Sequence, residues 1–247
     1  MWNARTVTVW LALCLLIQPA VHSQTVLFWA DKNQGSDDAL LLGLRKTGYS
    51  YEKAYSYVNF RERLVASSWD LAIIDVHNLW ESITRQEILA RVSDGGRVIL
   101  TDWSPSGDIP SAFGFTVQTE RNQPNLFAAD SRIWQGVNSP ITLFDAGWTT
   151  FSRSIAPAQG STVLATYDNG DAAIVMANDG RTIFNSFLDD TFDDSTREAR
   201  IQLAANEIKL VLDPPAPVPE RSTAAGMAAL LAMGGFSVVR LLRGQRA

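Results

Sequence analysis

The chain has 247 residues, of which 46% are hydrophobic and 19% charged, with 21 Lys and Arg against 26 Asp and Glu. This composition is that of a globular protein and excludes both a disordered chain and a membrane protein of several spans. Residues 24–213 carry 16 basic and 25 acidic side chains, a net charge of −9, which argues against nucleic acid as a partner.

Residues 1–23 predict a secretory signal peptide. Arg5 precedes an apolar run at 7–17, and small or medium residues lead to Ser23, so we expect signal peptidase to cleave near Ser23-Gln24. The alternative is an uncleaved anchor, but the run is shorter than the roughly 20 residues that a span needs. The sole cysteine, Cys14, lies in this run, so residues 24–213 have no disulfide, cysteine metal site or catalytic thiol.

The first half of the body predicts strands that alternate with helices. A polar loop after the first strand leads to a helix that starts at Asp37-Asp38 and stops at Gly48, and the second helix is expected to bury Phe60, Leu64 and Val65. Four strands separated by three helices predict a parallel sheet with right-handed crossovers. The strands are expected at 25–29, 53–58, 69–75 and 97–102, and the second and third helices at 59–67 and 82–92.

The second half begins with a loop-rich stretch at 103–159, with short strands expected at 115–118 and 141–144 and with Trp134 and Trp148 covering a sheet edge. Three further strands, at 163–167, 172–176 and 181–185, are joined by turn sequences that favour hairpins. Ser195 or Thr196 is expected to cap a last helix. The predicted fold class is α/β, a mostly parallel, flavodoxin-like sheet flanked by helices, with late antiparallel strands.

The C-terminal segment predicts a membrane anchor after a linker. Residues 214–219 are rich in proline, residues 223–239 carry no charge, and Arg240, Arg243 and Arg246 follow. Such a segment can just span the inner membrane, with the arginines on the cytoplasmic side and the body outside. We therefore divide the chain into a signal peptide at 1–23, an α/β domain at 24–213 and a sorting tail at 214–247.

The order of these parts resembles the PEP-CTERM sorting signal of Gram-negative bacteria that make exopolysaccharide. Val218-Pro219-Glu220 matches its motif, and Arg221 stands where a second proline is usual. The resemblance implies a precursor anchored in the inner membrane and facing the periplasm, which an exosortase-like enzyme processes for the cell envelope or the extracellular space. The alternative is an ordinary C-terminal anchor.

The body is similar to the class I glutamine amidotransferase-like fold, including its ThuA-like branches. The similarity rests on a strand ending in Asp75, a Gly95-Gly96 turn into an apolar strand, the late hairpins and a closing helix. In this family a catalytic cysteine follows the fourth strand, with His and Glu downstream. Here that turn reads Thr101-Asp102-Trp103-Ser104, and the body histidine His77 lies upstream. Glutaminase activity is therefore excluded.

Polar residues follow the predicted parallel strands, where open sheets of this kind bind their ligands. Acidic side chains that converge beside a tryptophan suit a sugar, a metal ion or a basic partner, although capping or turn roles are the alternative for each residue. The candidate ligand-binding residues are Asp31, Asn33, Asp75, His77, Asp102 and Trp103.

We expect a non-catalytic binding or structural domain linked to exopolysaccharide or the cell-surface matrix. Its stacking candidates are the loop residues Trp80, Trp103, Trp134 and Trp148. The alternative is a sugar-directed hydrolase or isomerase that uses Asp75, His77 and Asp102.

A cofactor is not expected, with one candidate exception. Four carboxylates could hold calcium, although they lack the internal glycine and closing glutamate of an EF-hand loop. They are Asp189, Asp190, Asp193 and Asp194.

Overall fold

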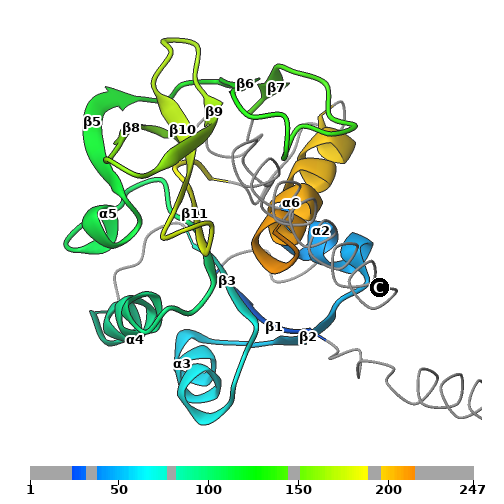
Figure 1. Cartoon of the computed structure of the whole chain (residues 1–247), viewed down its shortest axis with the longest axis vertical. Helices are drawn as coiled ribbons and strands as arrows, with labels where there is room; N and C mark the ends of the chain where they lie inside the picture. The colour runs from blue at the N-terminus through cyan, green and yellow to red at the C-terminus, as the bar shows by residue number, and fades with distance from the viewer. Residues whose placement is uncertain (1–23, 32–37, 77–81, 144–150, 189–195, 215–247) are drawn as a thin grey trace, which may run out of the picture. The chain divides into compact units, whose positions relative to one another are not determined.

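The computed structural model describes residues 24–31, 38–76, 82–143, 151–188 and 196–214 (Figure 1). The chain separates into two units, residues 1–213 and 214–247. Every helix and strand described below belongs to the first unit. Within the described ranges, no helix combines the length and the apolar character that a membrane span requires. The expected signal peptide and the expected anchor at 223–239 lie outside these ranges.

The parallel half of the sheet has the strand order β2-β1-β3-β4-β11. Its strands are short and, apart from β2, apolar, and β3 and β4 are buried along their whole length, as expected for strands covered on both faces. Their bounds are β1 (Thr25–Ala30), β2 (Ser50–Lys53), β3 (Leu71–Asp75), β4 (Val98–Thr101) and β11 (Thr182–Asn185). This half confirms the predicted α/β class.

The other half of the sheet is antiparallel and continues from β11 through β10, β9, β6 and β7, with β8 beside β10 and β5 beside β8. The predicted hairpins β9-β10 and β10-β11 are confirmed. In the second turn Asn178, Asp179 and Gly180 all have positive φ, which explains the residue types found there. The bounds are β5 (Phe115–Arg121), β6 (Asn125–Ala128), β7 (Ile141–Thr142), β8 (Arg153–Pro157), β9 (Thr162–Thr166) and β10 (Ala172–Ala177).

Helices cover both faces of the parallel half (Figure 1). Helices α2 (Ala39–Thr47) and α6 (Arg197–Leu212) pack on one face, and α3 (Tyr57–Ala66) and α4 (Ser82–Ser93) pack on the other. A single turn of helix, α5 (Ile109–Ala112), follows β4. Alternate residues of a strand therefore pack into two separate hydrophobic cores. Phe28 packs in the core with α2 and α6, whereas Leu27 packs in the core with α3 and α4.

Helix α2 shows how the sequence sets both its ends and its packing. The Asp38 carboxylate accepts a hydrogen bond from the Leu41 amide at 2.8 Å, and Gly48 ends the helix at φ 79°. Between them, Gly43 lies against α6: a Cβ there would be 2.8 Å from the Cβ of Ala204. The two helices are therefore packed closely because residue 43 has no side chain.

Two local predictions were wrong. The strand expected at 53–58 is β2 at Ser50–Lys53, because Ser56 accepts a hydrogen bond from the Asn59 amide at 3.1 Å and starts α3 at Tyr57. Val65, which was expected to be buried, is 66% exposed, while Phe60 and Leu64 are buried as predicted. Strands β6 and β8 were not predicted at all.

Candidate functional site

The carboxyl ends of the parallel strands meet along one edge of the sheet. The register places Ala30 beside Asp75, Asp75 beside Thr101, and Thr101 beside Asn185. Beyond the strands, the Asp31 amide donates to the Asp75 carbonyl at 3.1 Å, and the Asp102 amide donates to the Asn185 carbonyl at 3.0 Å. Asp31, Asp75 and Asp102 are thus brought to one edge, which we call the carboxyl edge.

The three aspartates differ in their access to solvent. Asp31 is exposed, whereas Asp75 and Asp102 are 3% and 1% exposed. The Asp102 Oδ1 atom accepts a hydrogen bond from the Ser104 amide at 2.7 Å, so this carboxylate stabilises the turn that follows β4. Of these three aspartates, Asp31 is the one that is exposed to solvent.

Two aromatic residues follow strand ends along the same edge. Trp103 is half-buried, and its ring centroid lies 4.8 Å from that of Phe151, at an interplanar angle of 53°. Tyr55 follows the end of β2, next to β1, and is 69% exposed. Sequence analysis did not identify Tyr55 as a candidate site residue because it assigned that residue to a strand. An aromatic residue just before Ser56, the serine that caps α3, was the signal that could have identified it.

A buried network of hydrogen bonds holds the strand ends at the carboxyl edge in place. Asn185 Nδ2 donates to Glu207 Oε2 at 3.0 Å and to Thr101 Oγ1 at 3.3 Å, and all three residues are at most 2% exposed. Glu207 comes from α6, so the network ties that helix to the ends of β4 and β11. Sequence analysis missed Glu207, although a carboxylate three residues after Ala204 in the buried stripe of the last helix was a visible signal.

A second anchor holds the chain just after β11. The Tyr167 hydroxyl is within 3.0 Å of the Ser186 carbonyl oxygen, and Ser186 Oγ donates to the Ala173 carbonyl at 2.9 Å. Burial raises the pKa of Tyr167, which therefore stays a neutral donor. These contacts hold the part of the carboxyl edge between β4 and β11 in a fixed position.

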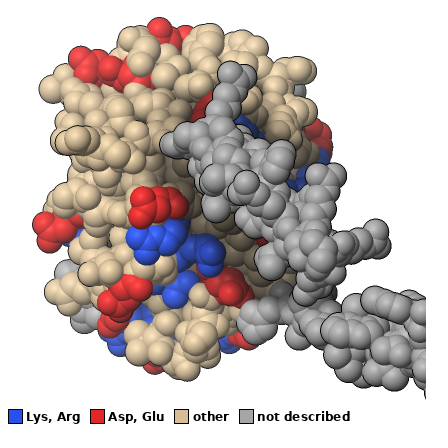
Figure 2. All heavy atoms as spheres, in the orientation of Figure 1, with Lys and Arg blue, Asp and Glu red and all other residues tan. Residues whose placement is uncertain are grey.

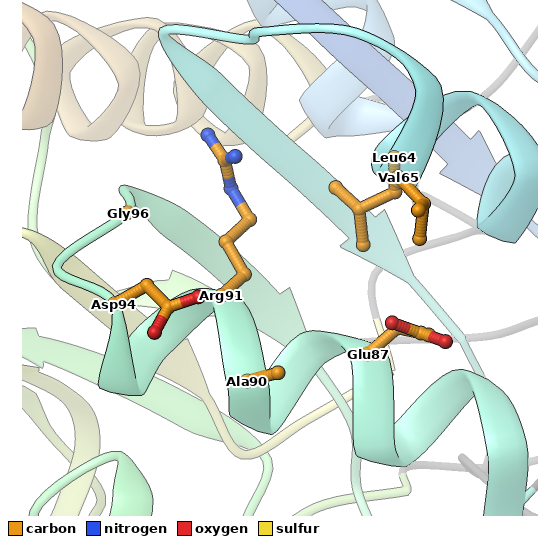
Figure 3. Close-up of a pocket in the computed structure, with 7 residues that line it drawn as sticks. All are labelled: Leu64, Val65, Glu87, Ala90, Arg91, Asp94 and Gly96. Carbon is orange, nitrogen blue, oxygen red and sulfur yellow. The ribbon is translucent and has the colours of Figure 1, made fainter.

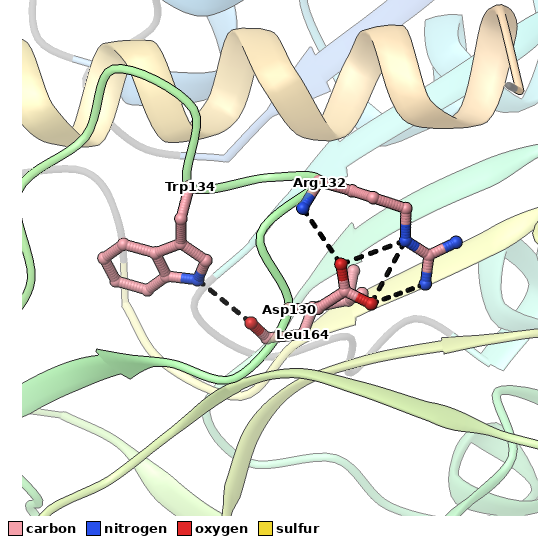
Figure 4. A network of polar contacts seen from close by, with 4 residues as sticks. All are labelled: Asp130, Arg132, Trp134 and Leu164. Carbon is pink, nitrogen blue, oxygen red and sulfur yellow. Dashed lines mark hydrogen bonds and ion pairs between the residues drawn. The ribbon is translucent and has the colours of Figure 1, made fainter.

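Trp134 does not serve as a surface platform for stacking. It is 7% exposed, and its indole N–H donates to the Leu164 carbonyl at 3.0 Å (Figure 4). Nearby, the Arg132 guanidinium makes hydrogen bonds to both oxygens of Asp130, and these hydrogen bonds lower the pKa of the Asp130 carboxyl. These contacts fix the β6-β7 connection over β9. Trp134 was expected to cover a sheet edge, but it packs over β9, which lies inside the sheet between β10 and β6.

Several predicted residues lie outside the described ranges. Within those ranges, no group of three or more His, Cys, Asp or Glu side chains is placed to hold a metal ion. The residues outside are Asn33, His77, Trp80, Trp148, Asp189, Asp190, Asp193 and Asp194.

No family model and no curated protein sequence matches this chain. Solved structures do share its fold. A glutamine amidotransferase from Thermotoga maritima has a TM-score of 0.56 at 7% identity, over 78% of this chain and 99% of that chain. A ThuA-like protein from Bacteroides uniformis has a TM-score of 0.52 at 10% identity, over 78% of this chain and 92% of that chain.

The same fold also occurs inside a larger enzyme. An α-L-fucosidase from Paenibacillus thiaminolyticus has a TM-score of 0.55 at 12% identity, over 85% of this chain but 36% of that chain. At these identities the likeness concerns the fold alone. It confirms the predicted similarity of the body to the ThuA-like and class I glutamine amidotransferase folds.

Proposed function

We propose that residues 24–213 form an exported, non-catalytic binding or structural domain whose ligand is a polysaccharide of the cell-surface matrix. The observation that carries the proposal is the state of Asp102. This residue occupies the strand tip where the related fold places a nucleophile, yet it is 1% exposed and its carboxylate accepts the Ser104 amide. A carboxylate used in this way supports a turn and does not attack a substrate.

Groups along the carboxyl edge suit the recognition of a sugar, and of these groups, in the strand order β2-β1-β3-β4, only Trp103 is next to Asp102. Trp103 and Tyr55 supply aromatic rings with exposed area, and Asp31 supplies an exposed carboxylate that accepts hydrogen bonds from hydroxyl groups. The rigid network of Asn185 and Glu207 keeps the underlying strand ends in place. A pre-formed edge of this kind binds with little loss of conformational entropy.

The test is a calorimetric titration of the purified full chain with a panel of purified bacterial exopolysaccharides. We expect Trp103→Ala to weaken binding about tenfold, because a stacked aromatic ring contributes about 1–1.5 kcal/mol. Trp69→Ala is the matched control, since Trp69 is also half-buried but precedes β3 and lies at the opposite edge. Equal binding by the wild type and Trp103→Ala would refute the site.

The rival proposal is a sugar-directed hydrolase or isomerase that uses Asp75, His77 and Asp102. The observation that favours it is that Asp75 lies beside Thr101, one residue before Asp102, on adjacent strands. This proposal predicts turnover of an oligosaccharide that Asp75→Asn abolishes. A ligand that binds and stays chemically unchanged would exclude it.

We also propose that the precursor is anchored in the inner membrane through residues 223–239, with the body in the periplasm, and that an exosortase-like enzyme releases it near Glu220. The Pro-rich segment and the terminal arginines support this proposal. Mass spectrometry of the mature protein tests it. We expect peptides to begin at Gln24 and to end near Glu220, whereas peptides covering 240–246 in the whole mature pool would mean a permanent anchor.

A further inference from the structure

Two arginines lie directly opposite each other where β5 pairs with β8. The register places Arg121 on β5 beside Arg153 on β8, and we call these two residues the arginine pair. Side chains of residues paired in this way lie on the same face, with Cβ atoms about 5 Å apart, so like charges repel each other. Burial and the charge of Arg121 lower the pKa of Arg153, whereas Glu120 raises it. A bound anion would relieve this repulsion.

Several other arginines of the described chain are accompanied by carboxylates. Figure 2 shows acidic and basic side chains next to one another on one face of the molecule. In the groove between α3 and α4, Arg91 stands on α4 between Glu87 and Asp94 (Figure 3). Within the described ranges, by contrast, neither member of the arginine pair forms an ion pair. The positive charge of the pair is therefore only partly balanced.

A bulge in β5 sets the geometry of the arginine pair. The register shifts between Val117 and Arg121, so residues 118–120 of β5 stand opposite a single residue of β8. Such bulges bend a strand and change the direction of its side chains. The Gln118 carbonyl, which lies in the bulge, accepts a hydrogen bond from Arg153 Nε at 2.6 Å. This contact orients the planar guanidinium and directs its two terminal nitrogens to other acceptors.

The arginine pair is continuous with the carboxyl edge. The Arg153 amide donates to the carbonyl of Ser186, the residue just after β11, at 2.8 Å. Phe151, two residues before Arg153, is the residue whose ring lies 4.8 Å from that of Trp103. The backbone that carries Arg153 is thus fixed at the end of the edge where Trp103 lies.

We propose that the arginine pair binds a carboxylate of the saccharide, so that the ligand is an acidic polysaccharide that contains uronic acids. This inference rests on the proposed function of the carboxyl edge. Guanidinium groups match a carboxylate with two parallel N–H···O hydrogen bonds, while the sugar ring stacks on Trp103. Because residues 24–213 carry a net charge of −9, an acidic chain needs a local positive site in order to bind.

The probes are oligouronates, namely oligomers of glucuronate, galacturonate, mannuronate and guluronate. The matched ligand for each is the same oligomer with its carboxylates reduced to primary alcohols. Calorimetric titration of the purified full chain measures the affinity for both. We expect at least one oligouronate to bind about tenfold more tightly than its reduced form, as for one charge-assisted contact that is partly exposed. Salt at about 1 M should remove most of this difference, because the Debye length falls to about 3 Å.

Substitutions in and beside the pair have opposite expected effects. Arg121→Gln should weaken binding of the oligouronate about fivefold and leave that of the reduced oligomer unchanged, and it should not alter folding because Arg121 is exposed. Arg153→Lys keeps the charge but loses the planar fork, so it should lose part of the preference. Glu120→Gln should strengthen binding of the oligouronate about twofold, because a repelling carboxylate is removed.

Arg181→Gln is the matched control. Arg181 is also half-buried, and its Nε donates to a backbone carbonyl at 2.8 Å, but it lies just before β11, at the opposite end of that strand. Its substitution should leave the affinity for both ligands unchanged.

Equal affinity for every oligouronate and its reduced form would overturn the inference, as would a preference that survives in the Arg121→Gln, Arg153→Gln double variant. If no oligouronate binds, the inference fails, and Trp103-dependent binding of a neutral polysaccharide would then leave the proposed function standing. Inorganic phosphate that binds the pair as tightly as the oligouronate would also overturn it, because the site would then serve a free oxyanion and not a saccharide.

Discussion

Asp102 illustrates, at the scale of one residue, how a buried carboxylate supports the turn that follows a strand. Its Oδ1 atom satisfies the Ser104 amide, and the residue is 1% exposed. We expect Asp102→Ala to lower the free energy of unfolding by about 1–3 kcal/mol, because a part-buried amide loses its acceptor.

Asp102→Asn keeps an oxygen at the same place and should be less harmful. Urea unfolding of the full chain and both variants measures the difference. An Asp102→Ala variant as stable as the wild type would show that the hydrogen bond to Ser104 contributes nothing.

The pair of Asp130 and Arg132 predicts a dependence of stability on pH. Hydrogen bonds from Arg132 lower the pKa of Asp130 in the folded state, so the folded state favours the charged carboxylate. The stabilisation is fully present above the ordinary pKa of about 3.9 and is lost as the pH falls through the lowered folded value. We expect Arg132→Gln to be less stable than the wild type at pH 7, by less than about 1 kcal/mol because Arg132 is partly exposed.

This difference should shrink below about pH 4. Guanidinium unfolding at pH 7 and pH 3 checks it. A difference that grows on acidification would contradict the role of this pair.

At the scale of elements, the contact between α2 and α6 depends on Gly43. Alanine in place of glycine usually stabilises a helix, by about 0.5–1 kcal/mol. Here the added Cβ would lie 2.8 Å from the Ala204 Cβ and from the Ala205 amide nitrogen, so the helices must separate. We expect Gly43→Ala to destabilise the chain by about 1–3 kcal/mol, as overpacking of a core does.

Ala204→Gly in the same chain removes one of these clashes and should restore part of the loss. Thermal unfolding of the two single variants and the double variant measures this coupling. An increase in stability from Gly43→Ala alone would mean that α2 and α6 are not in close contact at this point.

Element boundaries also show what local sequence can and cannot predict. The caps at Asp38 and Gly48 act within four residues, so the ends of α2 could be predicted. Both Ser50–Lys53 and 53–58 alternate in polarity, so alternation alone does not place the strand. The cap at Ser56 makes the residues from Tyr57 onward helical. The place of Glu207 in the buried stripe of α6 was a local signal, but its partner Asn185, 22 residues away in the sequence, could not be predicted locally.

At the scale of the whole molecule, the parallel arrangement of β1, β3 and β4 could be predicted because each is an apolar run and helices separate them. The parallel pairing of β11 with β4 was not predicted. Strands β6 and β8 could not be predicted, because their pairing with β9 and β10 depends on tertiary contacts and not on a turn between neighbours. Likewise, the meeting of Asp31, Asp75 and Asp102 followed from parallel topology, whereas their differences in exposure did not.

The two ends of the α/β domain are tied together. Gln24 Nε2 donates to Asp213 Oδ1 at 3.2 Å and to the Leu212 carbonyl at 3.3 Å, and the Tyr49 hydroxyl donates to the Asp213 carboxylate. Burial and this carboxylate raise the pKa of Tyr49. We expect Asp213→Ala to lower stability by about 1 kcal/mol and to expose the end of α6 to proteolysis. Identical digestion rates for the wild type and the variant would contradict this tie.

We propose that the carboxyl edge binds a saccharide without transforming it. The most direct measurement is a proton NMR time course of an oligosaccharide that binds the full chain. We predict that its resonances broaden on binding, that Trp103→Ala removes the broadening, and that no new anomeric signal appears. New anomeric signals that grow with the wild type and disappear with Asp75→Asn would contradict the claim and establish catalysis at this edge.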